Sequence, residues 1–334
     1  MIITANVVVG RSWASHAIGI LSGLTAGATF LFGALYFTGI LAPPSTAAAA
    51  QPLGVGIMVT AAIAVVVASN PVRSRIAGFL GMDPNNPVHV LALVLAVIWL
   101  GSNIAIVSLI DVLAVDKAQP PLTIVDLLAN QVPFLIIAVT GVGLYIRRNP
   151  TEVAVRLGVV RPVWWQITLA LAAAGLFVAF AQATVALSNA LTPQIAHNID
   201  VTTQHDFGGL LGSPIGIASL ALLPAICEEI LFRGALQPRL GLVLTALLFA
   251  SIHSQYSISF DTLAVFVLGL GLGFIRKYTN TTTSSICHAT YNLVVAIGVG
   301  DLIGLAIAAE VVLAAVTSFA LWSRRRRTAA VTIP

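Results

Sequence analysis

Two adjacent glutamates and an arginine interrupt one of the most apolar stretches of the sequence. Glu228, Glu229 and Arg233 all lie within segment 223–234. A charge at the centre of a membrane span costs about 2.5–3.5 kcal/mol, so three charges require compensation. Glu229 and Arg233 are four residues apart, share a helix face and are expected to pair. Glu228 has no partner on its own helix, and a buried unpaired carboxylate is a candidate general base.

Two histidines and an asparagine in later apolar stretches could complete a hydrolytic site. His253 follows Phe249 by four residues, and His288 precedes Asn292 by four. A carboxylate and an imidazole can share a water molecule and take its proton. A second imidazole and an amide can donate to a developing oxyanion, and a low dielectric strengthens both effects. This chemistry fits hydrolysis of a peptide bond.

Other polar residues are expected to have structural roles. Segment 192–207 contains four groups of metal-binding type, but we interpret it as a solvated loop on the non-cytoplasmic side, far from the motifs. These groups are His197, Asp200, His205 and Asp206. In the first four spans we expect Asn103 to be the only polar amide at depth.

The composition shows which class of protein must position these residues. Of 334 residues, 58% are hydrophobic and only 8% are charged, against about 25% charged in a typical soluble domain. This excludes a soluble globular enzyme and a disordered chain, and two cysteines exclude a disulfide-stapled secreted domain. We predict an all-α, polytopic transmembrane helix bundle in a lipid bilayer, in the cell membrane. The net charge is +4, but no basic face with interleaved aromatics suggests nucleic acid as a partner.

Apolar runs between polar breaks predict about ten spans. Their ranges are 13–41, 54–70, 88–111, 123–146, 163–190, 214–236, 241–256, 260–276, 283–299 and 303–322. With these spans, every basic cluster falls in a loop on one side. The clusters are Arg73 with Arg75, Arg147 with Arg148, Arg156 with Arg161, Arg239, Arg276 with Lys277, and Arg324 to Arg327. The positive-inside rule then places both termini in the cytoplasm.

The spans divide into two predicted bundles. Residues 1–146 form an N-terminal four-span bundle of unknown role, and residues 163–322 form the bundle that carries the motifs. Residues 147–162 mix arginines with valines and leucines and are predicted to be an interfacial linker. Residues 323–334 are a basic cytoplasmic tail.

The three motifs resemble those of the intramembrane endopeptidase family of CAAX prenyl proteases and bacteriocin-processing proteins (the CPBP family). The family is marked by a glutamate pair followed by arginine, a phenylalanine four before a histidine, and a histidine four before an asparagine or aspartate. Here they are Glu228, Glu229 and Arg233, then Phe249 and His253, then His288 and Asn292. The resemblance covers about residues 160–300 and leaves the first four spans unexplained.

The resemblance implies a role for each matching residue. Glu228 would activate water with help from His253, while His288 and Asn292 would hold the oxyanion. Glu229 and Arg233 would order the site, which would face a cavity that opens towards the cytoplasm. Members of the family have been described both as metalloproteases and as metal-free glutamate proteases. We expect no cofactor, because the i, i+4 histidine pair of soluble zinc proteases is missing; if zinc is present, its ligands would be Glu228, His253 and His288.

The leading functional prediction is therefore an intramembrane endopeptidase, a CAAX protease-like hydrolase. Its partner would be a membrane-associated peptide or protein, cleaved in CAAX-type processing or in peptide maturation. Two alternatives remain. One is a non-catalytic immunity or scaffold protein of the same fold. The other is an ion-coupled transporter that uses the buried glutamates, although the sequence has no internal repeat to support it.

Overall fold

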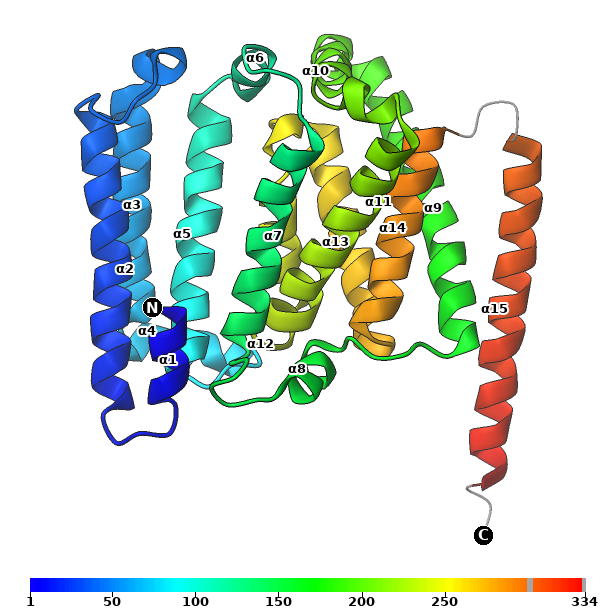
Figure 1. Cartoon of the computed structure of the whole chain (residues 1–334), viewed down its shortest axis with the longest axis horizontal. Helices are drawn as coiled ribbons and strands as arrows, with labels where there is room; N and C mark the ends of the chain where they lie inside the picture. Colours follow the sequence, from blue (N-terminus) through cyan, green and yellow to red (C-terminus); the bar gives the residue numbers. More distant parts are fainter. Residues whose placement is uncertain (299–302, 332–334) are drawn as a thin grey trace.

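The computed structural model of the chain describes residues 1–298 and 303–331, with side chains up to residue 323. The described residues form helices and no β-strand. The long helices run roughly up and down in the view of Figure 1, with α12 and α13 partly behind α7 and α11. This confirms the predicted all-α helix bundle.

The first half of the chain supplies four long helices. Each of these helices overlaps one of the first four predicted spans. They are α2 (Ala14–Phe37), α3 (Ala50–Ala68), α5 (Pro87–Leu109) and α7 (Ile124–Gly141). Local signals fix their starts: the Asn86 side chain caps α5, and Thr123 with Asp126 forms a capping box at α7. The short helix α1 (Ile2–Val8) packs against α5 and α7.

The second half supplies the helices that carry the motifs. They are α9 (Trp164–Leu191), α11 (Pro214–Glu228), the π-helix η2 (Glu229–Leu236), α12 (Gln237–Ser251), α13 (Phe260–Tyr278), α14 (Thr281–Ile297) and α15 (Ile303–Val331). The chain turns back within α12, because Gly241 adopts a φ of 75° and a ψ of 172°. A positive φ of this kind favours glycine. Asn280 caps α14 through the backbone amide of Thr283.

Other helices lie at the two edges of the bundle (Figure 1). At one edge lie α6 (Val112–Lys117) and α10 (Pro193–Leu211), and at the opposite edge lie α4 (Asn70–Phe79) and α8 (Pro150–Leu157). We call these the α6/α10 edge and the α4/α8 edge. Two further short helices are η1 (Pro44–Ala49) and η3 (Ser254–Tyr256).

Within residues 1–298 and 303–331, seven helical segments are long and apolar enough to cross a membrane, which makes the chain a multi-pass integral membrane protein. They are Ala14–Phe37, Pro44–Ala68, Pro87–Leu109, Ile124–Gly141, Trp164–Leu191, Pro214–Ser251 and Ile303–Ser323. The run Pro214–Ser251 contains two of the predicted spans. Helices α13 and α14 match two more predicted spans but lie outside the seven. The count of ten and the cell membrane as location stay predictions.

Segment 192–207 is not the solvated loop that we expected. It lies in α10, which contacts α9, α11 and α6. The buried side chains of this helix recur every three or four residues, at Ile199, Thr202, Asp206 and Leu210. One helix face therefore packs on the bundle and includes Asp206, while His197 and Asp200 are exposed and His205 is half-buried.

One hydrophobic core joins the two predicted bundles. Its buried members include Val94 and Ala138 from the first segment and Leu231, Phe249 and Leu272 from the second. Helix α7 packs directly on α11 and η2. The first four spans thus form part of the wall around the motif-bearing helices. Segment 147–162 contains α8, whose Val153 and Leu157 are buried while Val155 is exposed, as expected for an interfacial helix.

Candidate active site

A cavity of about 780 Å³ reaches from the α6/α10 edge into the bundle. Its outer wall includes Gln119, Asp206 and Tyr256, and its inner wall includes Glu228 and His288. The basic clusters of α4 and α8 lie at the opposite edge, which the positive-inside rule assigns to the cytoplasm. With this assignment the cavity opens away from the cytoplasmic face, which differs from the expected cytoplasmic opening; the side to which the cavity opens stays a prediction.

Glu228 lies in the wall of this cavity and is almost completely buried, with 3% of its surface exposed. Its Oε1 atom accepts a hydrogen bond of 2.8 Å from Nε2 of Gln131 on α7. Its Oε2 atom makes no hydrogen bond with any described group of the protein. One carboxylate oxygen is thus held in place, while the other can accept a proton.

The predicted pair of Glu229 and Arg233 is present. Nη1 of Arg233 lies 3.0 Å from Oε1 of Glu229, and both side chains are buried to 1% exposure or less. Arg233 also donates through Nη2 to the carbonyl oxygen of Gly269 on α13, at 3.2 Å. The pair is therefore desolvated but compensated, as a buried charge must be.

The glutamates stand at the junction of an α-helix and a π-helix. Glu228 ends α11 and Glu229 begins η2. A π-helix is rare and is often found at functional sites. At this junction Glu228 bonds towards α7, whereas Glu229 bonds towards Arg233 and α14. Two neighbouring carboxylates thereby have separate partners and separate surroundings.

Phe249 explains the spacing of the second motif. Its ring centroid lies 4.9 Å from that of His253 and 5.9 Å from that of His288. The guanidinium carbon of Arg233 lies 4.1 Å from the same ring centroid, within cation–π distance. One aromatic side chain therefore packs against both imidazoles and the arginine.

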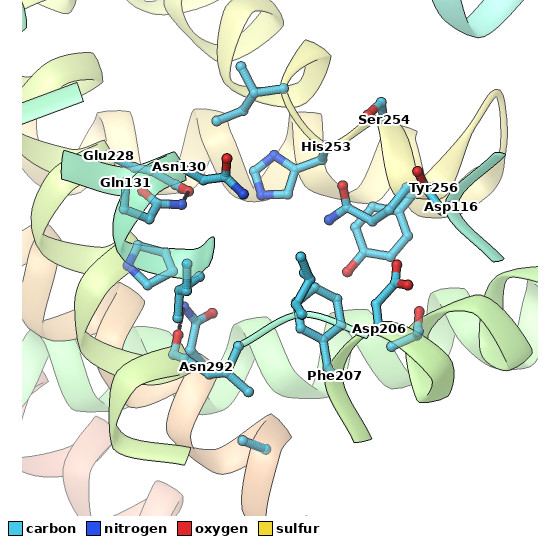
Figure 2. A pocket seen from close by; sticks show the side chains of 18 of the residues that line it. Asp116, Asn130, Gln131, Asp206, Phe207, Glu228, His253, Ser254, Tyr256 and Asn292 are labelled. Carbon is cyan, nitrogen blue, oxygen red and sulfur yellow. Dashed lines mark hydrogen bonds between the residues drawn. The ribbon is translucent and has the colours of Figure 1, made fainter. Parts of the chain in front are cut away.

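His253 is oriented by a hydrogen bond to the backbone. Its Nδ1 atom lies 2.8 Å from the carbonyl oxygen of Phe249. A carbonyl can only accept, so Nδ1 carries the proton and, in the neutral ring, Nε2 is left as the acceptor. The ring of His253 stacks on Tyr256, with 6.3 Å between the centroids and 4° between the planes. Glu228, His253 and Asn292 surround the same open space, with Asp206 and Tyr256 across it (Figure 2).

His288 and Asn292 come from the same turn region of α14 and line the cavity. Nδ1 of His288 lies 3.2 Å from Oε1 of Glu229, so this carboxylate joins the arginine and the imidazole. Nδ2 of Asn292 donates to the carbonyl oxygen of Leu220 at 3.4 Å. The structure thus brings all six predicted site residues to one wall of the bundle: Glu228, Glu229, Arg233, His253, His288 and Asn292.

Sequence reasoning missed two amides in the first four spans. Gln131 bonds to Glu228, and Asn130 lines the cavity beside it. The expectation that Asn103 is the only polar amide at depth was therefore wrong. Asn103 also lines the cavity, and it donates to Oγ of Ser251 at 3.3 Å. The sequence feature that could have identified Gln131 as a site residue is the presence of its amide within an apolar run.

Two acidic residues at the cavity mouth were also missed. Asp206 on α10 and Asp116 on α6 line the outer wall. Burial raises the pKa of Asp116, and the neighbouring Asp206 raises it further. Asp206 in turn lies 3.0 Å from Nδ1 of His205. The mouth therefore has acidic groups, while the basic clusters belong to the other edge.

The residues named as possible zinc ligands do not form a metal cluster. Across the described ranges, no group of three or more histidine, cysteine, aspartate or glutamate side chains could hold a metal ion. Nδ1 of His253 and Nδ1 of His288 are already engaged by a carbonyl and a carboxylate. We derive no step through zinc, and the absence of a cofactor stays a prediction.

The comparisons with known proteins concern the motif-bearing helices. Residues 211–294 match a family model described as type II CAAX prenyl endopeptidase Rce1-like. This range runs from the end of α10 through α14 and includes all three motifs. It confirms the family resemblance predicted from the motifs. Because the matched family is a protease family, the match also supports a hydrolase activity. No curated protein and no solved structure matches the chain.

Proposed function

We propose that this protein is an intramembrane endopeptidase in which Glu228 activates a water molecule for attack on a peptide bond. One observation carries the proposal. Glu228 is buried in the cavity wall, with Oε1 fixed by Gln131 and Oε2 unbonded. A carboxylate held in this way in a water-excluding interior is suited to general-base chemistry.

The first step transfers a proton from water to Glu228 as the water oxygen bonds to the carbonyl carbon of the substrate. His253 assists by accepting a hydrogen bond at Nε2, because its Nδ1 proton is directed to Phe249. The negative charge that develops on the carbonyl oxygen is stabilised by the amide of Asn292 and by His288, which can donate from Nε2 when both ring nitrogens carry a proton, since Nδ1 is held by Glu229. Glu228 then returns the proton to the leaving amine as the carbon–nitrogen bond breaks.

Glu229 and Arg233 position these groups without touching the substrate. Glu229 binds Nδ1 of His288 and so orients the second imidazole. Arg233 neutralises Glu229 and packs on Phe249, which in turn contacts His253. The ion pair therefore orders both imidazoles from the side away from the cavity.

The substrate we propose is a membrane-associated peptide or protein segment that enters from the α6/α10 edge. The cavity wall there combines apolar side chains such as Leu122 and Phe207 with the polar groups of Gln119 and Asp206. A CAAX-type substrate is what the matched family suggests, and maturation of another membrane peptide fits the same chemistry. The catalytic steps are the same in both cases.

The test is a comparison of membrane proteomes with mapped peptide termini. A strain that lacks the gene is complemented with the wild type, with Glu228→Gln or with Glu152→Gln. Glu228→Gln keeps the shape of the side chain and removes only the base. The variant protein should therefore accumulate to the normal level, while one precursor stays uncut. Glu152 lies in α8, away from the cavity, and its variant should restore cleavage.

The result also separates the alternatives. If Glu228→Gln restores the wild-type peptide termini and phenotype, the protein is a scaffold or immunity factor of this fold and the proposed function fails. A precursor that accumulates in the Glu228→Gln strain identifies the substrate directly.

A further inference from the structure

A second cavity, of about 400 Å³, lies near the α4/α8 edge, on the other side of the bundle from the candidate active site. We call it the arginine cavity. Four arginines line it: Arg147, Arg148, Arg156 and Arg239. Of the described residues, Trp99 alone lines both this cavity and the larger one, so one aromatic residue belongs to both walls.

The four arginines have only neutral partners. Arg147 donates to Oδ1 of Asn6 at 2.9 Å, and Arg148 donates to the carbonyl oxygen of Val142. Arg156 and Arg239 donate to backbone carbonyl oxygens, of Gly234 at 3.1 Å and of Gly81 at 3.2 Å.

Among the described residues that line the arginine cavity there is no aspartate or glutamate. The ion pairs found among the described residues do not include any of the four arginines. The Nε atom of Arg239 is buried without a hydrogen-bond partner in the described part of the chain. Arg148, Arg156 and Arg239 are half-buried and Arg147 is exposed. Cations gathered around one cavity without a counter-charge create a favourable site for an anion.

The ionisation of Arg156 agrees with this arrangement. Burial, together with repulsion from Arg239 and Arg148, lowers the pKa of Arg156 to about 10. Burial and the charge of Arg148 also lower the pKa of Arg147. Each group carries its charge at neutral pH at a cost that a bound anion would offset.

The inner part of the arginine cavity is apolar. It is lined by Leu91, Leu95, Trp99, Ile137, Leu231 and Phe232. A space of this volume lies within the usual range for small-molecule sites, which are mostly apolar with a few placed polar groups. Here the polar lining consists of the four arginines together with Asn86 and His89.

We propose that the arginine cavity binds an anionic lipid, with its phosphate head on the arginines and hydrocarbon in the apolar part. The four guanidinium groups supply paired donors that suit phosphate oxygens. The edge at which they lie carries the other basic clusters, where anionic headgroups of the cytoplasmic leaflet would be found. Hydrocarbon explains the apolar lining, which a free phosphate ion would leave empty.

Native mass spectrometry of the full-length protein in detergent tests the proposal. The probes are phosphatidylglycerol, phosphatidylcholine with the same acyl chains, and inorganic phosphate. The wild type should retain phosphatidylglycerol at least tenfold more strongly than phosphatidylcholine. Equal retention of the two lipids would overturn the proposal. Displacement of the bound lipid by millimolar inorganic phosphate would show that the site is for a free phosphate ion, and would also overturn it.

Variants locate the bound lipid. Arg156→Gln with Arg239→Gln should reduce retention of phosphatidylglycerol to the level of phosphatidylcholine. Arg75→Gln is the matched control, because Arg75 is exposed on α4 at the same edge and does not line the cavity. Its retention should equal that of the wild type; a loss as large as that of the double variant would overturn the proposal.

The double variant could lose the lipid because it misfolds, so a second variant that keeps every arginine provides an independent test. Ala92 lines the arginine cavity, so Ala92→Phe should fill its apolar part. We expect this variant to lose the retained lipid while still unfolding cooperatively. Undiminished retention in Ala92→Phe would show that hydrocarbon does not occupy the cavity. Neither variant alters a residue of the candidate active site, so failure here leaves the proposed hydrolase function standing.

Discussion

At the scale of single residues, Phe249 shows how the sequence pattern and the site geometry are related. It contacts Arg233, His253 and His288, which come from three different motifs. The motifs could be predicted because charged and imidazole side chains are conspicuous in apolar spans. The packing of all three on one ring could not be predicted, since it depends on how η2, α12 and α14 are placed.

Gln131 is the residue whose contribution is most directly testable. We expect Gln131→Leu to lower kcat about tenfold or more, because Glu228 loses the donor that fixes Oε1, and a hydrogen bond to a charged group is worth about 1.5–3 kcal/mol. Asn103→Leu is the control, since this amide lines the same cavity but bonds to Ser251. Equal losses in the two variants would contradict a specific role for Gln131.

Arg233→Ala should mainly destabilise the folded protein, so that the protein level falls whatever the effect on catalysis. Removal of one partner of a buried ion pair typically costs about 3–5 kcal/mol, and Glu229 would be left as an uncompensated charge. The expected result is a strongly reduced protein level in membranes, measured by quantitative immunoblot. Arg75→Ala, at an exposed position, should accumulate normally. Normal accumulation of Arg233→Ala would mean that the pair does not support the fold.

At the scale of elements, α10 and α6 form the part that sequence reasoning placed least well. The polar content of segment 192–207 indicated a loop, but Ile199, Thr202, Asp206 and Leu210 lie on one helix face. That spacing was a usable signal of an amphipathic helix. The contact of α10 with the cavity was not readable from the sequence, because it follows from packing against α6 and α11.

The acidic mouth formed by these helices predicts a pH effect on stability. Because the pKa of Asp116 is raised above its ordinary value of 3.8, the folded state binds more protons than the unfolded state between the two values. Stability therefore falls as pH rises through that interval, and the penalty is complete above the raised pKa. Asp116→Asn removes the penalty and should raise the unfolding temperature at pH 7.

The difference between Asp116→Asn and the wild type should shrink as the pH falls and vanish below 3.8, where the wild-type carboxyl is protonated in both states. Thermal unfolding in detergent across this range measures it. Asp200→Asn, at an exposed position on α10, should show no such trend. A stabilisation that does not change with pH would exclude ionisation of Asp116 as its cause.

At the scale of the whole molecule, the direction of the larger cavity can be measured. Gln119 is exposed and lines its mouth, whereas Arg75 is exposed at the α4/α8 edge. We expect a membrane-impermeant maleimide to label Gln119→Cys in intact cells, and to label Arg75→Cys only after lysis. The native Cys227 and Cys287 are buried and should give little background. The reverse pattern would show that the basic edge faces outward and that the cavity opens to the cytoplasm.

Composition alone was sufficient to predict the helical bundle, because apolar chains in a bilayer must satisfy their backbone groups internally. The role of the first four spans was not predictable in the same way. Their helices carry few polar residues. Gln131 can reach Glu228 only because α7 packs against α11 and η2. The family match, which begins at residue 211, likewise does not include them.

The position of Trp99 between the two cavities has an electrical consequence. Its ring lies 5.6 Å from that of Phe134, which lies 6.0 Å from that of Phe232, so the partition between the cavities is a thin aromatic layer. In an energised membrane the voltage falls mainly across low-dielectric material. Water in either cavity would therefore shorten the distance over which the transmembrane voltage falls. Moving one charge through the full drop is worth about 2.3 kcal/mol per 100 mV. Glu228 lines the larger cavity, so a proton that reaches it from that cavity would cross only part of the drop, and the membrane potential would change its energy by only that part.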